Sequence, residues 1–403
     1  MSELKERISK LVSNISPSAT FAVADKAREL KEKGVDVITF ASGEPDFSTP
    51  ENVKKVAAKA MDDNFTKYTA VEGIAELKKA VCEKFKRDND VEYEPSQIVV
   101  CNGAKQALYD AFLTICDPGD EVMLPAPAYV SFPEQIKLAG AKPLYVKTKE
   151  ENNFRLTLDD IKNSYNPNVK ALLLNTPNNP CGSMVKRDEL EKIAGFLIEK
   201  NIWAITDEIY EKLVYDDNRH ISLSSISDEI KEQTIMVNGV SKTYAMTGWR
   251  IGFAAGPKDI ISAMIKLQGH TTSNVNSIAQ KATIEALLGS QDVVEEMRKE
   301  YDRRRIYMVD KFNSFEGINC NYPDGAFYVF PNIVGLIGKK YNGKELKEEM
   351  DVVEFFLDVA NVAVVPGKAF QYPNHIRLTF ATSMENIVEG MDRLEKAINK
   401  LED

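Results

Sequence analysis

The chain has 403 residues, of which 43% are hydrophobic and 28% charged, and its formal net charge is −10 at pH 7. This acidic balance excludes a protein that attracts nucleic acid or anionic membranes through its overall charge, because both partners require a basic surface. Five scattered cysteines and only three histidines predict neither a disulfide framework nor a metal site.

Residues 1–45 are predicted to form an N-terminal arm, with a helix and then a strand at 35–40, that packs against the C-terminal part of the chain. Residues 1–11 are charged and lack the apolar core of a signal peptide. No apolar run in the chain reaches the roughly 18 residues of a membrane span. We therefore expect a cytoplasmic protein that does not insert into membranes.

From residue 95 to residue 257, short apolar runs alternate with longer amphipathic stretches. Strands that are apolar on both faces and alternate with helices are typical of a parallel sheet that helices cover. The strands are expected at 97–101, 121–124, 169–174, 202–206, 234–237 and 251–255. We therefore predict an α/β fold in which residues 46–286 form a large domain around a mostly parallel sheet.

The pattern changes near residue 286. A charged helix is predicted over 293–312, and shorter strands follow at 327–330 and 376–380. This order of elements favours a separate, smaller α+β domain over residues 287–403.

Reactive and polar residues follow the predicted strands of the large domain, where open α/β sheets bind their ligands. They comprise a lysine able to form an imine, a carboxylate, a phenol, an amide, a guanidinium and a glycine-containing helix start: Lys242, Asp207, Tyr210, Asn179, Arg250, and Gly103 with Ala104. This set suits a phosphorylated heteroaromatic aldehyde. The lysine would bind the aldehyde, the carboxylate would keep a ring nitrogen protonated, and the helix start with the guanidinium would bind the phosphate.

The segment 239–252, GVSKTYAMTGWRIG, resembles the cofactor-lysine signature of the class I aminotransferases, which are fold-type-I pyridoxal-phosphate enzymes. The resemblance extends over the whole chain through GEPDF at 43–47, NNP at 178–180, DEIY at 207–210 and Arg377. It implies a three-layer α/β/α large domain with a smaller α+β domain, and pyridoxal 5′-phosphate as the cofactor.

The resemblance gives the central residues their roles. Lys242 forms a Schiff base with the cofactor and then acts as the general base for the proton shift. Asp207 pairs with the ring nitrogen, and Tyr210 and Asn179 hydrogen-bond the 3-oxygen of the ring. Without the motifs, each of these residues has an alternative interpretation. Lys242 would be a surface charge and Asp207 a cap of the following helix. Tyr210 and Asn179 would occupy turn or core positions.

The resemblance also assigns residues to the phosphate. Gly103 and Ala104 open a helix whose free N–H groups attract anions, Arg250 adds a bidentate charge, and Ser241 adds a hydroxyl. Tyr68 resembles a tyrosine that reaches a phosphate in the neighbouring subunit. The implied assembly is a homodimer.

Substrate binding is expected to centre on Arg377, which stands in a strand among apolar neighbours. The resemblance assigns it to the substrate α-carboxylate, together with the backbone of Gly43 and with Asn179, whereas an internal acidic partner is the alternative. Tyr129 holds the position of an aromatic ring that lies flat on the cofactor, next to the substrate. Cys181 replaces a threonine that is usual in relatives, and we expect no redox role for it.

The substrates implied are amino acids and 2-oxo acids. GAKQAL at 103–108 and PSAT at 17–20 resemble the pattern of the bacterial aspartate aminotransferases, which pass the amino group of L-aspartate to 2-oxoglutarate and yield oxaloacetate and L-glutamate. Lys105 is then predicted to pair with the distal carboxylate. Relatives that also accept prephenate tend to carry lysine at position 16, where this chain has Ser16, so the sequence leaves prephenate activity open.

Two other enzyme activities fit the same fold: an aminotransferase for aromatic amino acids, kynurenine or a broad range of amino acids, and a carbon–sulfur lyase. A non-catalytic regulator is disfavoured, because such relatives carry an added DNA-binding domain and only about 45 residues precede the core here.

Overall fold

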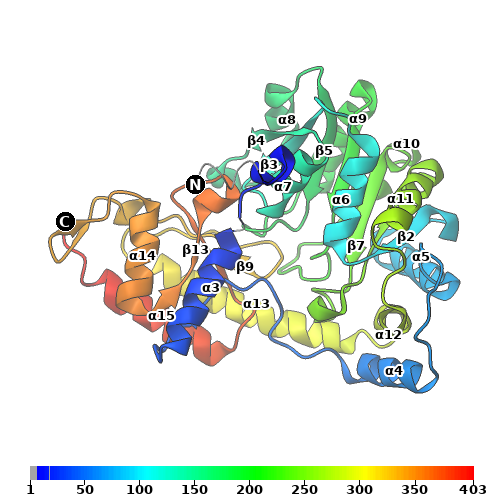
Figure 1. Cartoon of the computed structure of the whole chain (residues 1–403). Coiled ribbons are helices and arrows are strands. Elements are labelled where there is room, and N and C mark those ends of the chain that lie inside the picture. The colour runs from blue at the N-terminus through cyan, green and yellow to red at the C-terminus, as the bar shows by residue number, and fades with distance from the viewer. Residues whose placement is uncertain (1–6, 18) are drawn as a thin grey trace.

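The computed structural model describes residues 7–17 and 19–403 (Figure 1), apart from the side chains at positions 19, 21 and 24. Ser18 and the side chain of Ala19, both in the PSAT motif, lie outside the described part. None of the described helices is long and apolar enough to cross a bilayer. All five cysteines are free thiols.

A seven-stranded sheet forms the centre of the larger part of the molecule, in the order β2-β8-β7-β6-β5-β3-β4. Its strands are β2 (Ile98–Cys101), β3 (Glu121–Ala126), β4 (Lys142–Lys147), β5 (Val169–Asn175), β6 (Trp203–Asp207), β7 (Thr234–Gly239) and β8 (Gly252–Ala255). The pairings from β7 across to β4 are parallel, whereas β8 runs antiparallel to both of its neighbours. All six predicted strands are present, each within two residues of its predicted ends.

The seventh strand, β4, was not predicted. It lies at the edge of the sheet, and of its six residues only Val146 is buried. An edge strand faces solvent along one side, so it does not need the continuous apolar run by which the other strands are recognised.

Helices cover both faces of the sheet, as the three-layer prediction requires. Along β3 the side chains alternate, with Val122 and Leu124 in one apolar cluster and Met123 in another. The first cluster includes α6 (Ala104–Ile115), α7 (Ser131–Leu138) and α11 (Lys258–Thr271), and the second includes α8 (Leu158–Ser164), α9 (Arg187–Lys200) and α10 (Asp228–Lys231). Because both faces are buried, the carboxyl ends of the strands are the part of the sheet left open to a ligand.

The remaining helices of the larger part are α4 (Glu51–Asp62), α5 (Ala75–Asn89) and α12 (Ser277–Leu288), and α12 packs on both α4 and α5. They lie at the end of the sheet that carries β2, on the right of Figure 1. Short 3-10 turns occur at Pro95–Gln97, Glu150–Asn152, Leu223–Ser225, Thr247–Trp249, Val334–Leu336 and Gly367–Phe370.

A smaller group of elements lies beside the large sheet (Figure 1). It contains a three-stranded antiparallel sheet, β13 (Val365–Pro366), β14 (Ile376–Thr379) and β9 (Tyr328–Val329). The other elements are α13 (Asp292–Asn313), the hairpin of β10 (Lys340–Tyr341) and β11 (Lys344–Glu345), α14 (Glu349–Ala360), β12 (Val362–Ala363) and α15 (Met384–Ile398). The predicted helix 293–312 is confirmed, and the strands predicted at 327–330 and 376–380 are shorter than expected.

The N-terminal arm contacts this smaller group. It contains α2 (Lys10–Ser13), α3 (Ala19–Glu32) and β1 (Ile38–Thr39), and β1 pairs in parallel with β12. The strand predicted over 35–40 is therefore limited to two residues. We propose that the boundaries near residues 45 and 286 separate an arm, a large domain and a small domain.

Candidate active site

A pocket of about 820 Å³ opens at the carboxyl ends of β5, β6 and β7 and is closed on its other side by the N-terminal arm and the smaller group. It brings together residues that are far apart in the sequence. Of the predicted site residues, it is lined by Gly43, Ala104, Lys105, Tyr129, Asn179, Asp207, Tyr210, Ser241, Lys242, Arg250 and Arg377. Gly103 lies immediately beside it, and Tyr68 lies outside it.

Lys242 follows β7, and its Nζ donates a hydrogen bond to the carbonyl oxygen of Gly43. Burial lowers the pKa of Lys242 from 10.5 to about 8, and the positive charges of Arg250 and Arg377 act in the same direction. The lowered pKa increases the fraction of neutral amine near neutral pH, and the neutral amine is the nucleophilic form that attacks an aldehyde. The surface-charge alternative for Lys242 is therefore wrong.

Asp207 ends β6, and its Oδ1 accepts a hydrogen bond of 3.3 Å from the N–H of Ile209. Residues 209–212 form turns and no helix begins there, so the alternative that Asp207 caps a following helix is wrong. Burial raises the pKa of Asp207 to about 7, and the neighbouring Glu208 adds to the rise. A cationic nitrogen beside this carboxylate would reverse the effect and stabilise both charges.

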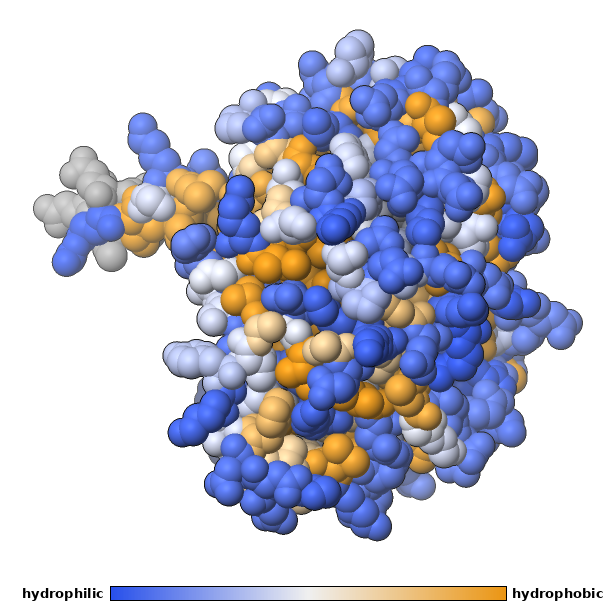
Figure 2. Space-filling model, turned by 90° about the vertical axis from the view of Figure 1, so that its right-hand side faces the viewer, coloured by the Kyte–Doolittle hydropathy of each residue, from blue (hydrophilic) through white to orange (hydrophobic). Residues whose placement is uncertain are grey.

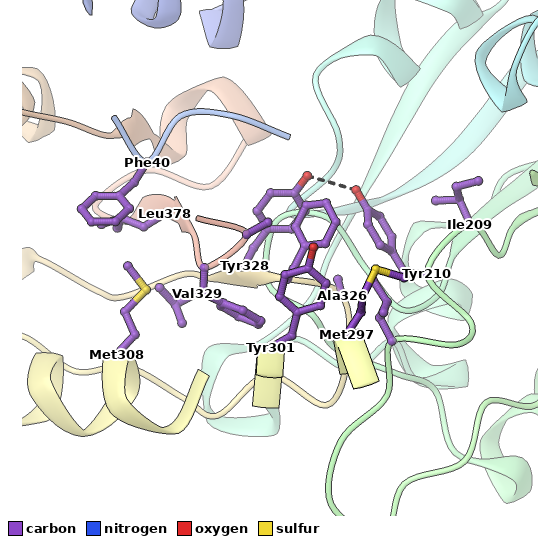
Figure 3. Packing of buried hydrophobic residues seen from close by; sticks show 14 of the residues in the cluster. Phe40, Ile209, Tyr210, Met297, Tyr301, Met308, Ala326, Tyr328, Val329 and Leu378 are labelled. Carbon is purple, nitrogen blue, oxygen red and sulfur yellow. Dashed lines mark hydrogen bonds between the residues drawn. The ribbon is translucent and has the colours of Figure 1, made fainter. Parts of the chain in front are cut away.

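Tyr210 lies in the turn after β6, and its hydroxyl is 3.0 Å from the hydroxyl of Tyr328 on β9 (Figure 3). Tyr328 also lines the pocket, but the sequence analysis did not identify it. The only sequence signal was its place in the aromatic run 327–330, which reads as core. Asn175 was also missed, and its Oδ1 accepts a hydrogen bond of 2.9 Å from the N–H of Asn179.

Arg377 is a buried cation with 1% of its surface exposed. Its Nη1 donates to Asn179 Oδ1 at 3.2 Å and its Nη2 donates to the Ala41 carbonyl at 2.8 Å, whereas its Nε has no hydrogen-bond partner among the described residues. In the described part of the chain no Asp or Glu pairs with it, so the internal acidic partner is absent there. A buried guanidinium with unused donors suits a carboxylate ligand, because such a pair satisfies both groups.

The start of α6 provides a second anion-binding position. Gly103 has a φ of +80°, and a Cβ on it would lie 2.3 Å from Arg250 Nη2, so only glycine fits. Arg250 donates to the carbonyls of Thr247 at 2.9 Å and Asn102 at 3.2 Å. Helix-opening N–H groups such as that of Ala104 have no partner within their helix. Together with Arg250 they fit a phosphate group.

Three further predicted residues occupy different places around the pocket. Lys105 is exposed, and its Nζ lies 5.5 Å from the centre of the Tyr129 ring. Tyr68 is 91% exposed and does not reach the pocket of its own chain. Cys181 is buried beside Asn178, and burial raises its pKa to about 12. Its thiol is therefore protonated at neutral pH and is a poor nucleophile.

A buried polar network adjoins Asp207 without lining the pocket. Glu208, Glu211 and His220 have ligand-type atoms within 4.8 Å of one another. Lys84 pairs with Glu211, and Asn89 Nδ2 donates to Glu208 at 3.1 Å and to Glu211 at 2.7 Å. Because the lysine and the amide already satisfy these carboxylates, the network is structural, and we assign no metal to it.

The donor set of the pocket fits a phosphorylated heteroaromatic aldehyde. It offers an amine with a lowered pKa, a carboxylate that forms no ion pair with the described residues, a phenol and an anion site, contributed by Lys242, Asp207, Tyr210, and the start of α6 with Arg250. The buried Arg377 provides a second, separate anion site.

Comparison with known proteins agrees with this chemistry. Residues 35–394 match the family described as "Aminotransferase class I and II". An aspartate aminotransferase of Bacillus subtilis is 44% identical over 98% of this chain and 99% of its own length. A protein of Aquifex aeolicus named probable aspartate/prephenate aminotransferase is 43% identical over 99% of this chain and 100% of its own length.

Among solved structures, the aspartate aminotransferase from Rhizobium meliloti matches with a TM-score of 0.95 at 38% identity, over 98% of this chain and 99% of that one. Fold, sequence and site chemistry therefore agree over nearly the whole length. The chain belongs to the class I aminotransferases, which are pyridoxal-phosphate enzymes that act on amino acids and 2-oxo acids.

Proposed function

We propose that this chain transfers the amino group of L-aspartate to 2-oxoglutarate and so forms oxaloacetate and L-glutamate. The observation that carries the proposal is the placement of Lys242, whose pKa is lowered, in one pocket with Asp207 and with Arg377, which forms no ion pair with any described residue. The names of the relatives described above support aspartate as the donor.

The chain's own residues divide the work of the reaction. The cofactor, when bound, supplies a conjugated ring that accepts the electron pair left at the substrate Cα. Lys242 would hold the cofactor through Nζ and, as a neutral amine, would accept the proton from the substrate Cα. Asp207 holds a proton on the ring nitrogen by its negative charge, and Tyr210 and Asn179 bind the 3-oxygen of the ring.

The remaining cofactor contacts fix its orientation. The N–H of Ala104, the Arg250 guanidinium and the Ser241 hydroxyl would hold the phosphate. The N–H of Gly103, which was also predicted to bind it, instead donates to the Cys101 carbonyl at 2.7 Å. Tyr129, which lines the pocket, would offer its aromatic face to the ring. With the phosphate and one ring face held in this way, the cofactor would stay within reach of Lys242.

The substrate has two carboxylates, and we assign a cation to each. Arg377, with its unused donors, binds the α-carboxylate next to Gly43 and Asn179. Lys105 stands at the pocket rim beside Tyr129, where it would meet the distal carboxylate of a dicarboxylic acid.

Replacement of Lys105 with alanine should lower kcat/KM for aspartate and 2-oxoglutarate. A charge-assisted hydrogen bond contributes roughly 1.5–3 kcal/mol, which corresponds to a loss of about 10- to 150-fold. Alanine and phenylalanine have no distal charge to lose, so their kcat/KM should stay close to that of the wild type. Lys142→Ala, at an exposed position of β4, is the matched control. Equal losses on all substrates would instead give Lys105 a role in cofactor binding or folding.

A screen of amino donors against 2-oxoglutarate tests the reaction and the substrate class together. Aspartate should be the best donor, ahead of phenylalanine and kynurenine, and cystathionine should release no cleavage product. Prephenate should be a poor acceptor, because position 16 carries Ser16. A strong preference for phenylalanine or kynurenine would overturn the aspartate assignment while leaving the aminotransferase intact.

We propose that the active unit is a homodimer in the cytoplasm. Tyr68 is 91% exposed, and Ile8, Leu11 and Val12 expose apolar side chains near the N-terminus. Figure 2 shows a mostly hydrophilic face from which this N-terminal segment projects with apolar residues on it. A partner subunit that covers the segment would remove this apolar surface from water, and its Tyr68 would reach the phosphate.

Mixing two defective variants tests the shared site. Lys242→Ala and Tyr68→Phe chains that form hybrid dimers should produce one site with both lesions and one with neither. Activity should therefore recover above that of either variant alone. A fully active monomer in sedimentation, or no recovery in hybrids confirmed by mass, would contradict the proposal.

A further inference from the structure

Tyr328 contacts two residues that have different tasks in the proposed function. Its hydroxyl lies 3.0 Å from the hydroxyl of Tyr210, and its ring centre lies 4.4 Å from the guanidinium carbon of Arg377. Figure 3 shows the two hydroxyls directed at each other, from β9 and from the turn after β6. The cofactor side and the carboxylate side of the pocket therefore meet at this ring.

Packing fixes the position of the Tyr328 hydroxyl. Tyr328 and Tyr210 are 1% and 4% exposed. A Cβ added to Gly43 would lie 3.1 Å from the Tyr328 hydroxyl, so the hydroxyl rests against the backbone whose carbonyl accepts from Lys242. The ring also makes an edge contact with Tyr210 at 5.9 Å and a tilted contact with Phe327 at 4.8 Å. The side chain has little room to turn away.

The two hydroxyls together hold two protons, but only one hydrogen bond joins them. If Tyr328 donates, the free proton belongs to Tyr210. If Tyr210 donates, the free proton belongs to Tyr328. The direction of this one bond therefore decides which phenol can donate to a ligand in the pocket.

We propose that Tyr328 is a positioning residue whose hydroxyl donates to Tyr210, so that the proton of Tyr210 is committed to an acceptor in the pocket, while its ring supports Arg377. The inference rests on the proposed contact of Tyr210 with the 3-oxygen of the cofactor. A phenol that accepts one hydrogen bond is a stronger donor in the next, because successive bonds polarise one another. Tyr328 thereby strengthens that contact.

The bound cofactor reports this contact through the pH midpoint of its visible absorption. A donor to the 3-oxygen favours the deprotonated form, in which that oxygen carries more negative charge, and so lowers the midpoint. Burial keeps the pKa of both phenols above their usual value, so neither loses its proton in the same range. The other charged or titratable groups that line the pocket are unchanged in the variants: Arg28, Lys31, Glu44, Lys105, Tyr129, Asp207, Lys242, Arg250 and Arg377.

The experiment titrates four cofactor-loaded proteins: wild type, Tyr328→Phe, Tyr210→Phe and the double variant. Loss of a neutral hydrogen bond in Tyr328→Phe should raise the midpoint by about 0.4 to 1 pH units. Tyr210→Phe should raise the midpoint further. The double variant should have the same midpoint as Tyr210→Phe alone. Tyr165→Phe, whose ring packs on Phe196 away from the pocket, is the matched control.

The sign of the change separates the alternatives. A lower midpoint in Tyr328→Phe would show that Tyr210 donates to Tyr328, and an unchanged midpoint would show no link to the cofactor. If Tyr328→Phe raised the midpoint equally in the wild type and in Tyr210→Phe, Tyr328 would act on the cofactor independently of Tyr210. Each of these results overturns the inference.

Binding of succinate, an unreactive dicarboxylate, tests the second task of Tyr328. Tyr328→Phe keeps the ring and should bind succinate like the wild type, whereas Tyr328→Leu should bind it about 2- to 30-fold more weakly through the lost cation–π contact. Equal affinity in Tyr328→Leu would remove the support of Arg377 from the inference. If the wild type itself failed to transaminate, the proposed function would fall instead.

Discussion

Replacement of Lys242 with alanine should abolish transamination and remove the covalent attachment of the cofactor. No other described lysine side chain except Lys31 and Lys105 lines the pocket, and neither follows β7. Loss of the general base alone costs about 10²- to 10⁴-fold, and loss of the attachment adds to it. Turnover should therefore fall by at least about two to four orders of magnitude. Initial rates with aspartate, together with the visible spectrum of the purified protein, measure both effects.

The fold should survive this change. The pKa of Lys242 is about 8 in the folded protein, below its ordinary 10.5, so the unfolded chain binds more protons between these values. The buried charge therefore destabilises the cofactor-free protein below about pH 8, and the penalty fades only as the pH rises toward 10.5. At pH 7 the cofactor-free variant should melt at the same temperature as the wild type or higher. Lys266→Ala, at an exposed position of α11, should change neither property. Full transamination by Lys242→Ala would refute the assignment.

Replacement of Asp207 with asparagine should lower kcat/KM by several orders of magnitude with almost no change in side-chain volume. The asparagine amide has no negative charge with which to hold a proton on the ring nitrogen. Each ~1.4 kcal/mol of lost transition-state stabilisation lowers the rate tenfold. Cofactor retention should weaken as well, which dialysis followed by absorbance measures. Rates within a few-fold of wild type would leave Asp207 with a structural role only.

Asp110→Asn is a matched control for Asp207→Asn. Asp110 is also buried, with its pKa raised to about 6 by burial, but it lies on α6 outside the pocket lining. Its replacement removes a similar buried carboxylate and should leave kcat/KM near that of the wild type.

For Asp207 the folded pKa of about 7 means that the charge destabilises the cofactor-free protein above that pH. The cofactor-free Asp207→Asn variant should therefore be at least as stable as wild type at pH 8.

Much of the site was predictable because parallel strands place their carboxyl ends at one edge of a sheet. The six apolar runs located the strands, and the residues after them, among them Asp207, Asn179 and Lys242, then fell into one pocket. The motifs around Lys242 and Arg377 identified the family. Those inferences need only local sequence, since each residue is placed by the strand that precedes it or contains it.

What the sequence determined by itself was therefore the α/β class, the strands with buried faces, the family and the lysine. Only the tertiary structure decided the partners of these residues. The contact of Tyr210 with Tyr328 joins positions 118 residues apart, and that of Arg377 with Asn179 joins positions 198 apart. The tertiary structure also showed that Arg377 has no acidic partner in the described chain, that Asp207 caps no helix, and that the solvent-facing edge strand β4 exists. Such contacts depend on how separate elements pack, and no local periodicity records that packing.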